Sequence, residues 1–167
     1  MKNTSSLLTL IVLTMTSFST SRRPAADSAE GIAHQVVAAF RQSSAESFVA
    51  LLPSLSEFHE LMQENASIYG NYLAEAKSEF TGQYTGNIMP SAKASFERVL
   101  WEGRTKGIDW NEIRYAGLAV NATPEAPLTN SSFTVFFSAQ GKEYRLHIDR
   151  ALVIHSKWRV SPFIRLG

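Results

Sequence analysis

Alternating apolar and polar residues mark the last third of the chain as β-structure. Phe133, Val135 and Phe137 recur at every second position, which is the period of a strand with one buried face. Two further alternating runs cover residues 144–149 and 157–160, and short polar breaks at 139–142 and His155-Ser156 separate the runs. We therefore expect three antiparallel strands over residues 131–166, joined by two tight turns.

The alternation changes phase after Asp149, because Ala151 and Val153 become the apolar odd positions. This change predicts a β-bulge near Asp149-Arg150, or a strand whose far end is covered on both faces. A fourth strand is expected over residues 112–120, ahead of a loop. Pro162 predicts that the last strand lies at an edge or ends there. A meander of four strands with one apolar face needs a second layer to cover it.

The residues before the sheet carry helical patterns. Capping boxes begin at Asp27, Ser43 and Ser54, each followed three residues later by glutamate. Apolar residues three to five positions apart follow each box and predict helices with one apolar face. The first predicted helix carries an apolar stripe from Ile32 to Phe40, a short helix follows at 46–52, and a third helix reaches about Asn65. A longer apolar stripe at 68–84 predicts a helix that frays near Gly82 and Gly86, and the last helix runs from Pro90 to a C-terminal Gly107.

These elements predict an α+β fold, with N-terminal helices packed on a C-terminal curved four-stranded antiparallel sheet. We expect residues 27–167 to form one domain. Residues 1–21 read as a secretory signal peptide, because a basic start and a short uncharged apolar run precede small residues. An uncleaved anchor and a buried N-terminal helix are the alternatives. Residues 22–26 are expected to be a disordered tether.

Composition limits the cellular location and the binding partners that we expect for this protein. The chain is 44% hydrophobic and carries 16 Lys+Arg against 15 Asp+Glu, for a net charge of +1. Without a dominant basic cluster, nucleic-acid binding is not expected. The chain has no cysteine, so neither a disulfide nor a bacterial lipoprotein anchor is available. We expect a secreted or periplasmic protein without an integral membrane segment after signal cleavage.

The order of elements resembles the cystatin-like α+β folds, including the NTF2-like superfamily, in the form of small secreted proteins of Bacteroidetes-type bacteria. The resemblance is carried by residues 102–113, 141–146 and 157–160, where a helix end runs into the first strand and two strands follow. It implies a cavity between helices and sheet, which holds an acid or base in NTF2-like enzymes. Neither such a motif nor the Gln-x-Val-x-Gly of cystatin inhibitors maps onto this chain.

Two groups of side chains are candidate ligand-binding residues. Arg145, His147 and Asp149 share one face of a strand, where His147 would be a base oriented by Asp149 if that face lined a cavity. The alternation favours instead a solvated outer face, opposite Leu146 and Ile148.

An aromatic stripe in the helical half would suit an apolar pocket, although such a stripe is more often plain core. The complete set of candidate ligand-binding residues is Tyr69, Tyr72, Tyr84, Trp101, Arg145 and His147. His34, His59 and His155 lack metal-ligand spacing, so no metal or cofactor is expected.

We expect a non-catalytic domain that binds a small ligand, a peptide or a protein partner. The alternative is an NTF2-like cavity enzyme that transfers protons near Tyr69, Tyr72 and His147. A homodimer through the exposed face of the sheet would suit this architecture.

Overall fold

The computed structural model describes residues 27–122 and 131–167. The expected signal peptide (1–21) and tether (22–26) lie outside these residues. The helical elements are α1 (Ala29–Arg41), α2 (Ala45–Val49), α3 (Leu55–Glu64), α4 (Ala66–Tyr69), η1 (Gly70–Tyr72), α5 (Leu73–Gln83), η2 (Tyr84–Ile88), α6 (Met89–Thr105) and η3 (Trp110–Glu112). The strands are β1 (Arg114–Ala122), β2 (Ser131–Ala139), β3 (Lys142–Ile154), β4 (Lys157–Val160) and β5 (Ile164–Leu166).

The strands form an open antiparallel sheet in the order β1-β2-β3-β4, which confirms the predicted meander and the α+β class. Gln140 and Gly141 both have positive φ, so they form the two-residue turn between β2 and β3. His155 and Ser156 also have positive φ and form the turn between β3 and β4.

The predicted bulge is present in β3. Ser131 lies opposite Ala151 and Phe133 lies opposite Ile148, so β3 contains one extra residue at Asp149-Arg150. One strand was not predicted from the sequence. The short β5 pairs with β3 at residues 146–148, on the same edge that β4 occupies further along. Pro162 therefore interrupts the edge, and the chain returns to it afterwards.

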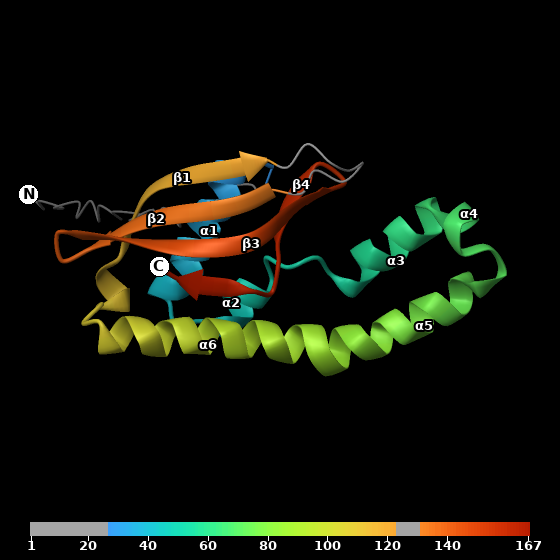
Figure 1. The fold of residues 1–167 in the computed structure, drawn as a ribbon, viewed down its shortest axis with the longest axis horizontal. Helices are drawn as coiled ribbons and strands as arrows, with labels where there is room; N and C mark the ends of the chain where they lie inside the picture. The colour runs from blue at the N-terminus through green and yellow to red at the C-terminus, as the bar shows by residue number, and fades with distance from the viewer. Residues whose placement is uncertain (1–26, 123–130) are drawn as a thin grey trace, which may run out of the picture.

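Three helices cover one face of the sheet (Figure 1). The alternate residues of β2 are buried against α1, α2 and α6, and the rings of Phe40 and Phe96 stack at a centroid distance of 4.3 Å. Trp110 packs between Phe40 and Phe137, and its indole N–H donates to the carbonyl oxygen of Leu100 at 3.0 Å. The core therefore lies between these three helices and the inner face of the sheet.

The C-terminal end of α6 follows the sequence prediction. Gly107 takes a φ of +77°, the left-handed conformation that ends many helices, and Ile108 is buried just beyond it. The Ile108 N–H donates to the carbonyl oxygen of Gly103 at 2.9 Å, which closes the last turn.

The helices α3, α4 and α5 do not cover the sheet, contrary to the expectation for the helical half. They project as an arm from the body of the molecule, which is formed by the sheet with α1, α2 and α6. The helix α5 continues through η2 into α6 as one long helical path (Figure 1). None of the residues in α3, α4 or α5 is buried. The predicted fraying at Gly82 and Gly86 is also wrong, because the helix widens into the π-helical turn η2 and continues.

Two predicted helix caps are each displaced by one residue. Ser28, rather than Asp27, caps α1 by accepting from the Gly31 N–H at 2.9 Å. Ser44, rather than Ser43, caps α2. Ser43 has a φ of +49° and belongs to the turn after α1, so its neighbour takes the extended conformation that a cap requires. Among the described residues, no helix combines the length and apolarity needed to span a bilayer.

Candidate functional site

A cleft lies where the arm joins the body. We call it the apolar cleft. Its helical side comes from the connector before α3, from α3 itself and from the end of η2, and its sheet side comes from β3, β4 and the loop before β5. Its lining residues are Leu52, Pro53, Phe58, Ile88, Asp149, Arg150, Leu152, Val160, Ser161, Pro162 and Phe163. Its volume is about 520 Å³, within the range of about 300–1,000 Å³ that is usual for small-molecule sites.

The connector from Leu51 to Pro53 is held on both sides. The Leu51 carbonyl oxygen accepts from the Val160 N–H at 3.1 Å, which ties the connector to β4. The Pro53 carbonyl oxygen accepts from the Tyr84 hydroxyl at 2.9 Å, which ties it to η2. Burial, and then the negative charge of Glu57, raises the pKa of Tyr84, so this hydroxyl stays protonated and able to donate.

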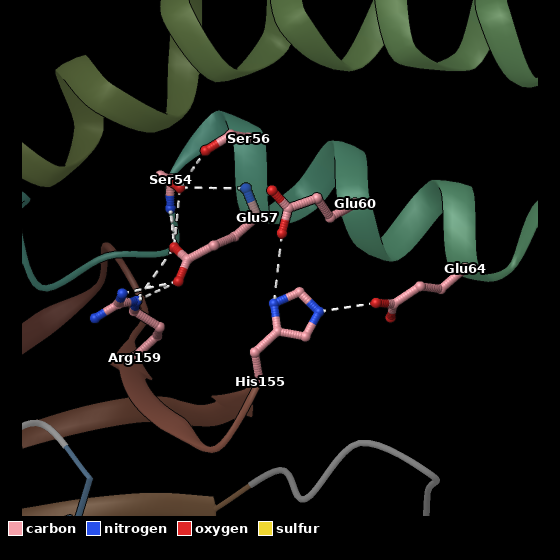
Figure 2. A network of polar contacts seen from close by, with 7 residues as sticks. All are labelled: Ser54, Ser56, Glu57, Glu60, Glu64, His155 and Arg159. Atoms are coloured by element: carbon pink, nitrogen blue, oxygen red, sulfur yellow. Dashed lines mark hydrogen bonds and ion pairs between the residues drawn. The ribbon is translucent and has the colours of Figure 1, made fainter.

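A polar network fixes α3 against β4 beside the cleft (Figure 2). Ser54 and Glu57 form a complete capping box, in which each accepts from the other's backbone N–H. The same Glu57 carboxylate accepts hydrogen bonds from Arg159 on β4, the shortest at 2.8 Å, and both side chains are mostly buried.

Opposing effects act on the pKa of Glu57. Partial burial raises it, but the hydrogen bonds from Arg159 and Ser54 together with the charge of Arg159 outweigh burial. The pKa of Glu57 is therefore lower than usual, and the ion pair with Arg159 persists at neutral pH. This pair sets the position of α3, and with it the Phe58 side of the cleft.

A second, more exposed contact reaches further along the arm. His155, in the turn between β3 and β4, lies between two glutamates of α3: its Nε2 is 2.9 Å from Glu64 and its Nδ1 is 3.5 Å from Glu60 (Figure 2). The network of Glu57, Arg159, His155, Glu60 and Glu64 thus runs along one side of α3 and joins the arm to the sheet.

The charged residues at the cleft differ in their partners. Asp149 accepts from Arg165 at 2.7 Å, so its charge is already balanced. The backbone of Arg150 is bonded to Ser161, whereas its guanidinium has no hydrogen bond or ion pair with residues 27–122 or 131–167. The remaining lining is almost entirely apolar, so the cleft suits a ligand with an apolar body.

The structure does not bring the predicted ligand-binding residues together. Tyr69 and Tyr72 belong to the far part of the arm, where the Tyr72 side chain is 72% exposed. Trp101 is 65% exposed on α6. Tyr84 is the member nearest the cleft, because its hydroxyl holds Pro53 and its ring lies 6.3 Å from that of Phe58.

Arg145 and His147 lie on the outer face of β3, as the alternation favoured. The neighbouring Leu146 and Ile148 are buried on the inner face. His147 Nδ1 is 3.1 Å from the Thr134 hydroxyl of the adjacent strand. These two residues belong to the sheet, whereas the aromatic members of the predicted set belong to α4, η1, η2 and α6.

Most residues that line the apolar cleft were not predicted from the sequence. The available signal was the run from Ala151 to Ile154, whose apolar residues point to both faces and predicted a strand end covered on two sides. Leu152 is the member of this run that faces the cleft. The segment that covers Leu152 depends on the direction in which the arm projects, and local periodicity does not specify that direction.

Within the described ranges, no three His, Asp or Glu side chains are arranged to hold a metal ion. No protein-family model, no curated protein sequence and no solved structure gives a significant match to this chain.

Proposed function

We propose that this chain is a non-catalytic binding domain that holds a small apolar molecule in the apolar cleft. The observation that carries the proposal is the chemistry of the lining. Leu52, Phe58, Leu152 and Phe163 surround a volume of about 520 Å³ at the junction of the arm and the sheet. Transfer of apolar ligand surface from water into such a cleft is favourable, at roughly 25 cal/mol per Å².

The way the cleft is built supports the same function. Its helical side depends on a connector bonded to both β4 and η2, and on a helix fixed by the pair of Glu57 and Arg159. A cleft whose walls are held by hydrogen bonds is organised before ligand arrives, which lowers the entropic cost of binding.

The alternative of a proton-transferring enzyme has less support. His147 faces outward beside Thr134, whereas Tyr69 and Tyr72 belong to the arm. The residues that would have to act on one substrate therefore come from separate parts of the molecule.

The proposal also includes export from the cytoplasm. The basic start, apolar run and small residues within positions 1–21 support a cleaved signal peptide and a secreted or periplasmic location. Mass spectrometry of the protein recovered from periplasm or medium tests this part, with an N-terminus close to residue 22 expected. The order of helices and strands supports the proposed resemblance to cystatin-like and NTF2-like proteins.

Binding is tested with N-phenylnaphthylamine, a neutral apolar probe whose fluorescence rises in an apolar site. We expect saturable binding to the purified protein. Phe163→Ser and Leu152→Gln should weaken it about fivefold to tenfold, a loss of roughly 1–1.4 kcal/mol. Phe163 is already 56% exposed, so its replacement should leave the fold intact.

The matched controls are Trp101→Ser and Tyr72→Ser, which also remove exposed aromatic rings but lie outside the cleft. Both should bind the probe as the unmodified protein does. The proposal is wrong if the probe does not saturate, or if these controls lose as much affinity as the cleft variants.

A further inference from the structure

A second hollow separates α1 and α2 from the start of β1. We call it the basic groove. Its volume is about 540 Å³, and its polar lining includes His34, Arg41, Gln42, Ser47, Arg114 and Tyr115. None of its lining residues belongs to the apolar cleft, so the two sites are distinct.

The charged residues that line the basic groove are all positive. Arg41 enters from the last turn of α1 and Arg114 from the first position of β1, and no aspartate or glutamate is among the lining residues. Neither guanidinium has an ion pair or hydrogen bond to any residue in the ranges 27–122 and 131–167. Two arginines that line the same groove without a partner among the described residues favour the binding of an anion there.

Two acidic residues next to the lining of the basic groove already have other partners. Glu30 accepts from the Tyr115 hydroxyl at 2.7 Å. Burial and this hydrogen bond raise the pKa of Tyr115, so its hydroxyl remains a donor committed to Glu30. Glu46 of α2 faces Lys93 of α6 at 3.9 Å. The positive charge of Arg41 and Arg114 is therefore not neutralised by these neighbours.

The floor of the basic groove is apolar. Val37, Leu51 and Ile113 line it, and each is at most 7% exposed. At one wall, the rings of His34 and Tyr115 are in contact at a centroid distance of 3.8 Å, with their planes tilted by 33°. A fully hydrated inorganic ion would not use this floor, whereas an anion with an apolar body would cover it and place its charged group at the arginines.

We propose that the basic groove binds a small organic oxyanion, with a carboxylate or phosphate group held by Arg41 and Arg114 and an apolar body on Val37, Leu51 and Ile113. The planar guanidinium fork matches both oxyanions with two parallel hydrogen bonds. This inference does not depend on ligand binding in the apolar cleft.

Three probes of similar shape test the inference: benzoate, phenyl phosphate and the neutral benzamide. Each is titrated into the ¹⁵N-labelled protein and followed by NMR. We expect saturable shifts of the His34, Ser47 and Tyr115 amides with at least one of the two anions, and binding of benzamide at least about tenfold weaker. The anion that binds more tightly identifies the preferred group. Raising the NaCl concentration should weaken anion binding.

Arg41→Gln and Arg114→Gln should each weaken anion binding by about tenfold or more. Both arginines are exposed, so the variants should fold, which thermal unfolding verifies. Arg104→Gln, an exposed arginine of α6 outside the basic groove, is the matched control and should bind normally. Equal binding of benzamide and benzoate, equal losses in Arg104→Gln, or no saturable shift with either anion would overturn the inference.

Discussion

At Gly103, α6 lies in close contact with Trp110, in the segment that leads into the sheet. A Cβ atom added at Gly103 would overlap the six-membered part of the Trp110 indole. Trp110 is 3% exposed and is fixed by its hydrogen bond to Leu100, so the ring has little freedom to withdraw. The contact between helix and indole therefore requires glycine at this position.

Gly103→Ala is expected to lower the free energy of unfolding by about 1–3 kcal/mol, the usual cost of overpacking a well-filled core. Urea unfolding followed by circular dichroism measures the change. Gly82→Ala is the control, because no atom lies within 4 Å of its Cβ position. It should raise the free energy of unfolding by about 0.5–1 kcal/mol through helix propensity. A Gly103→Ala variant as stable as the unmodified protein would contradict the packing argument.

Glu57 combines a helix cap with an ion pair, and these two roles can be separated. Glutamine at the same position retains the amide oxygen that a capping box needs, but it cannot carry the charge that faces Arg159. Because the pKa of Glu57 is lower in the folded protein than in the unfolded chain, the ionised carboxylate stabilises the fold above the unfolded value.

Glu57→Gln should lower the free energy of unfolding by about 1–3 kcal/mol near neutral pH. The difference from the unmodified protein should be full well above the ordinary glutamate pKa of about 4.3 and should shrink as the pH falls through the lower folded value. Urea unfolding across this range is the measurement. Glu97→Gln, an exposed residue of α6, should show little difference at any pH. A pH-independent loss in Glu57→Gln would indicate that the cap, not the charge, is responsible.

At the scale of elements, the arm of α3, α4 and α5 contains no buried residue. Its helices contact each other through Phe58 and Phe80, at a centroid distance of 4.7 Å, and through polar pairs such as Lys77 with Gln63. Arg159 holds the first turn of α3 against β4, and the exposed contacts of His155 hold the later turns of α3. Segments with little buried apolar surface open locally at a lower free energy than the core does.

Amide hydrogen exchange should therefore be faster in α3, α4 and α5 than in α1, β2 and the second half of α6. Arg159→Gln should accelerate exchange in α3 more than in α1, because it removes the contact that fixes the arm to β4. Mass spectrometry of peptides from the exchanged protein distinguishes these segments. Uniform protection across arm and core would show that the arm does not open as a separate unit.

Local patterns predicted the elements of the sheet well. Period-2 alternation specified β2 and the first part of β3, and the phase change located the bulge at Asp149-Arg150. The patterns did not reveal β5, because three residues after Pro162 are too few to establish a period. Nor did they distinguish an arm from a covering layer, because apolar residues at helical spacing serve either role.

At the scale of the whole molecule, Ser95 joins the middle of α6 to the C-terminal strand. Its hydroxyl donates to the carbonyl oxygen of Ile164 at 3.0 Å and accepts from the Ile164 N–H at 3.1 Å. The contact is buried and spans 69 residues of sequence. It holds β5 against α6 and so fixes the end of the loop that contributes Pro162 and Phe163 to the apolar cleft.

Ser95→Ala should lower the free energy of unfolding by about 1–3 kcal/mol, because the Ile164 N–H would be left buried without an acceptor. Ser91→Ala, one turn earlier in α6, has no such partner among the described residues and should change stability by less than about 0.5 kcal/mol. Thermal unfolding of the two variants gives the comparison. Similar melting temperatures for both would mean that the contact contributes nothing to stability.

The candidate sites illustrate what local sequence leaves open. The sequence identified the apolar run of β3, but not that its Leu152 lines one cleft together with Phe58 and Phe163. Arg41 and Arg114 are 73 positions apart in the sequence, and only the packing of α1 against β1 brings them to one groove. Neither the cleft residues nor the two arginines are spaced in the sequence in a way that a known motif would identify.

The period and phase of side chains within a few residues were enough to predict the class of fold, the order of the strands and the turns, and they gave the bulge as one of two alternatives. Tertiary structure alone decided that α3, α4 and α5 form an arm, that β5 returns to the edge of β3, and that two hollows flank the connector at Leu51 and Leu52. Those features depend on contacts between residues far apart in the chain, such as Glu57 with Arg159, whose energies favour one arrangement only once the elements have packed.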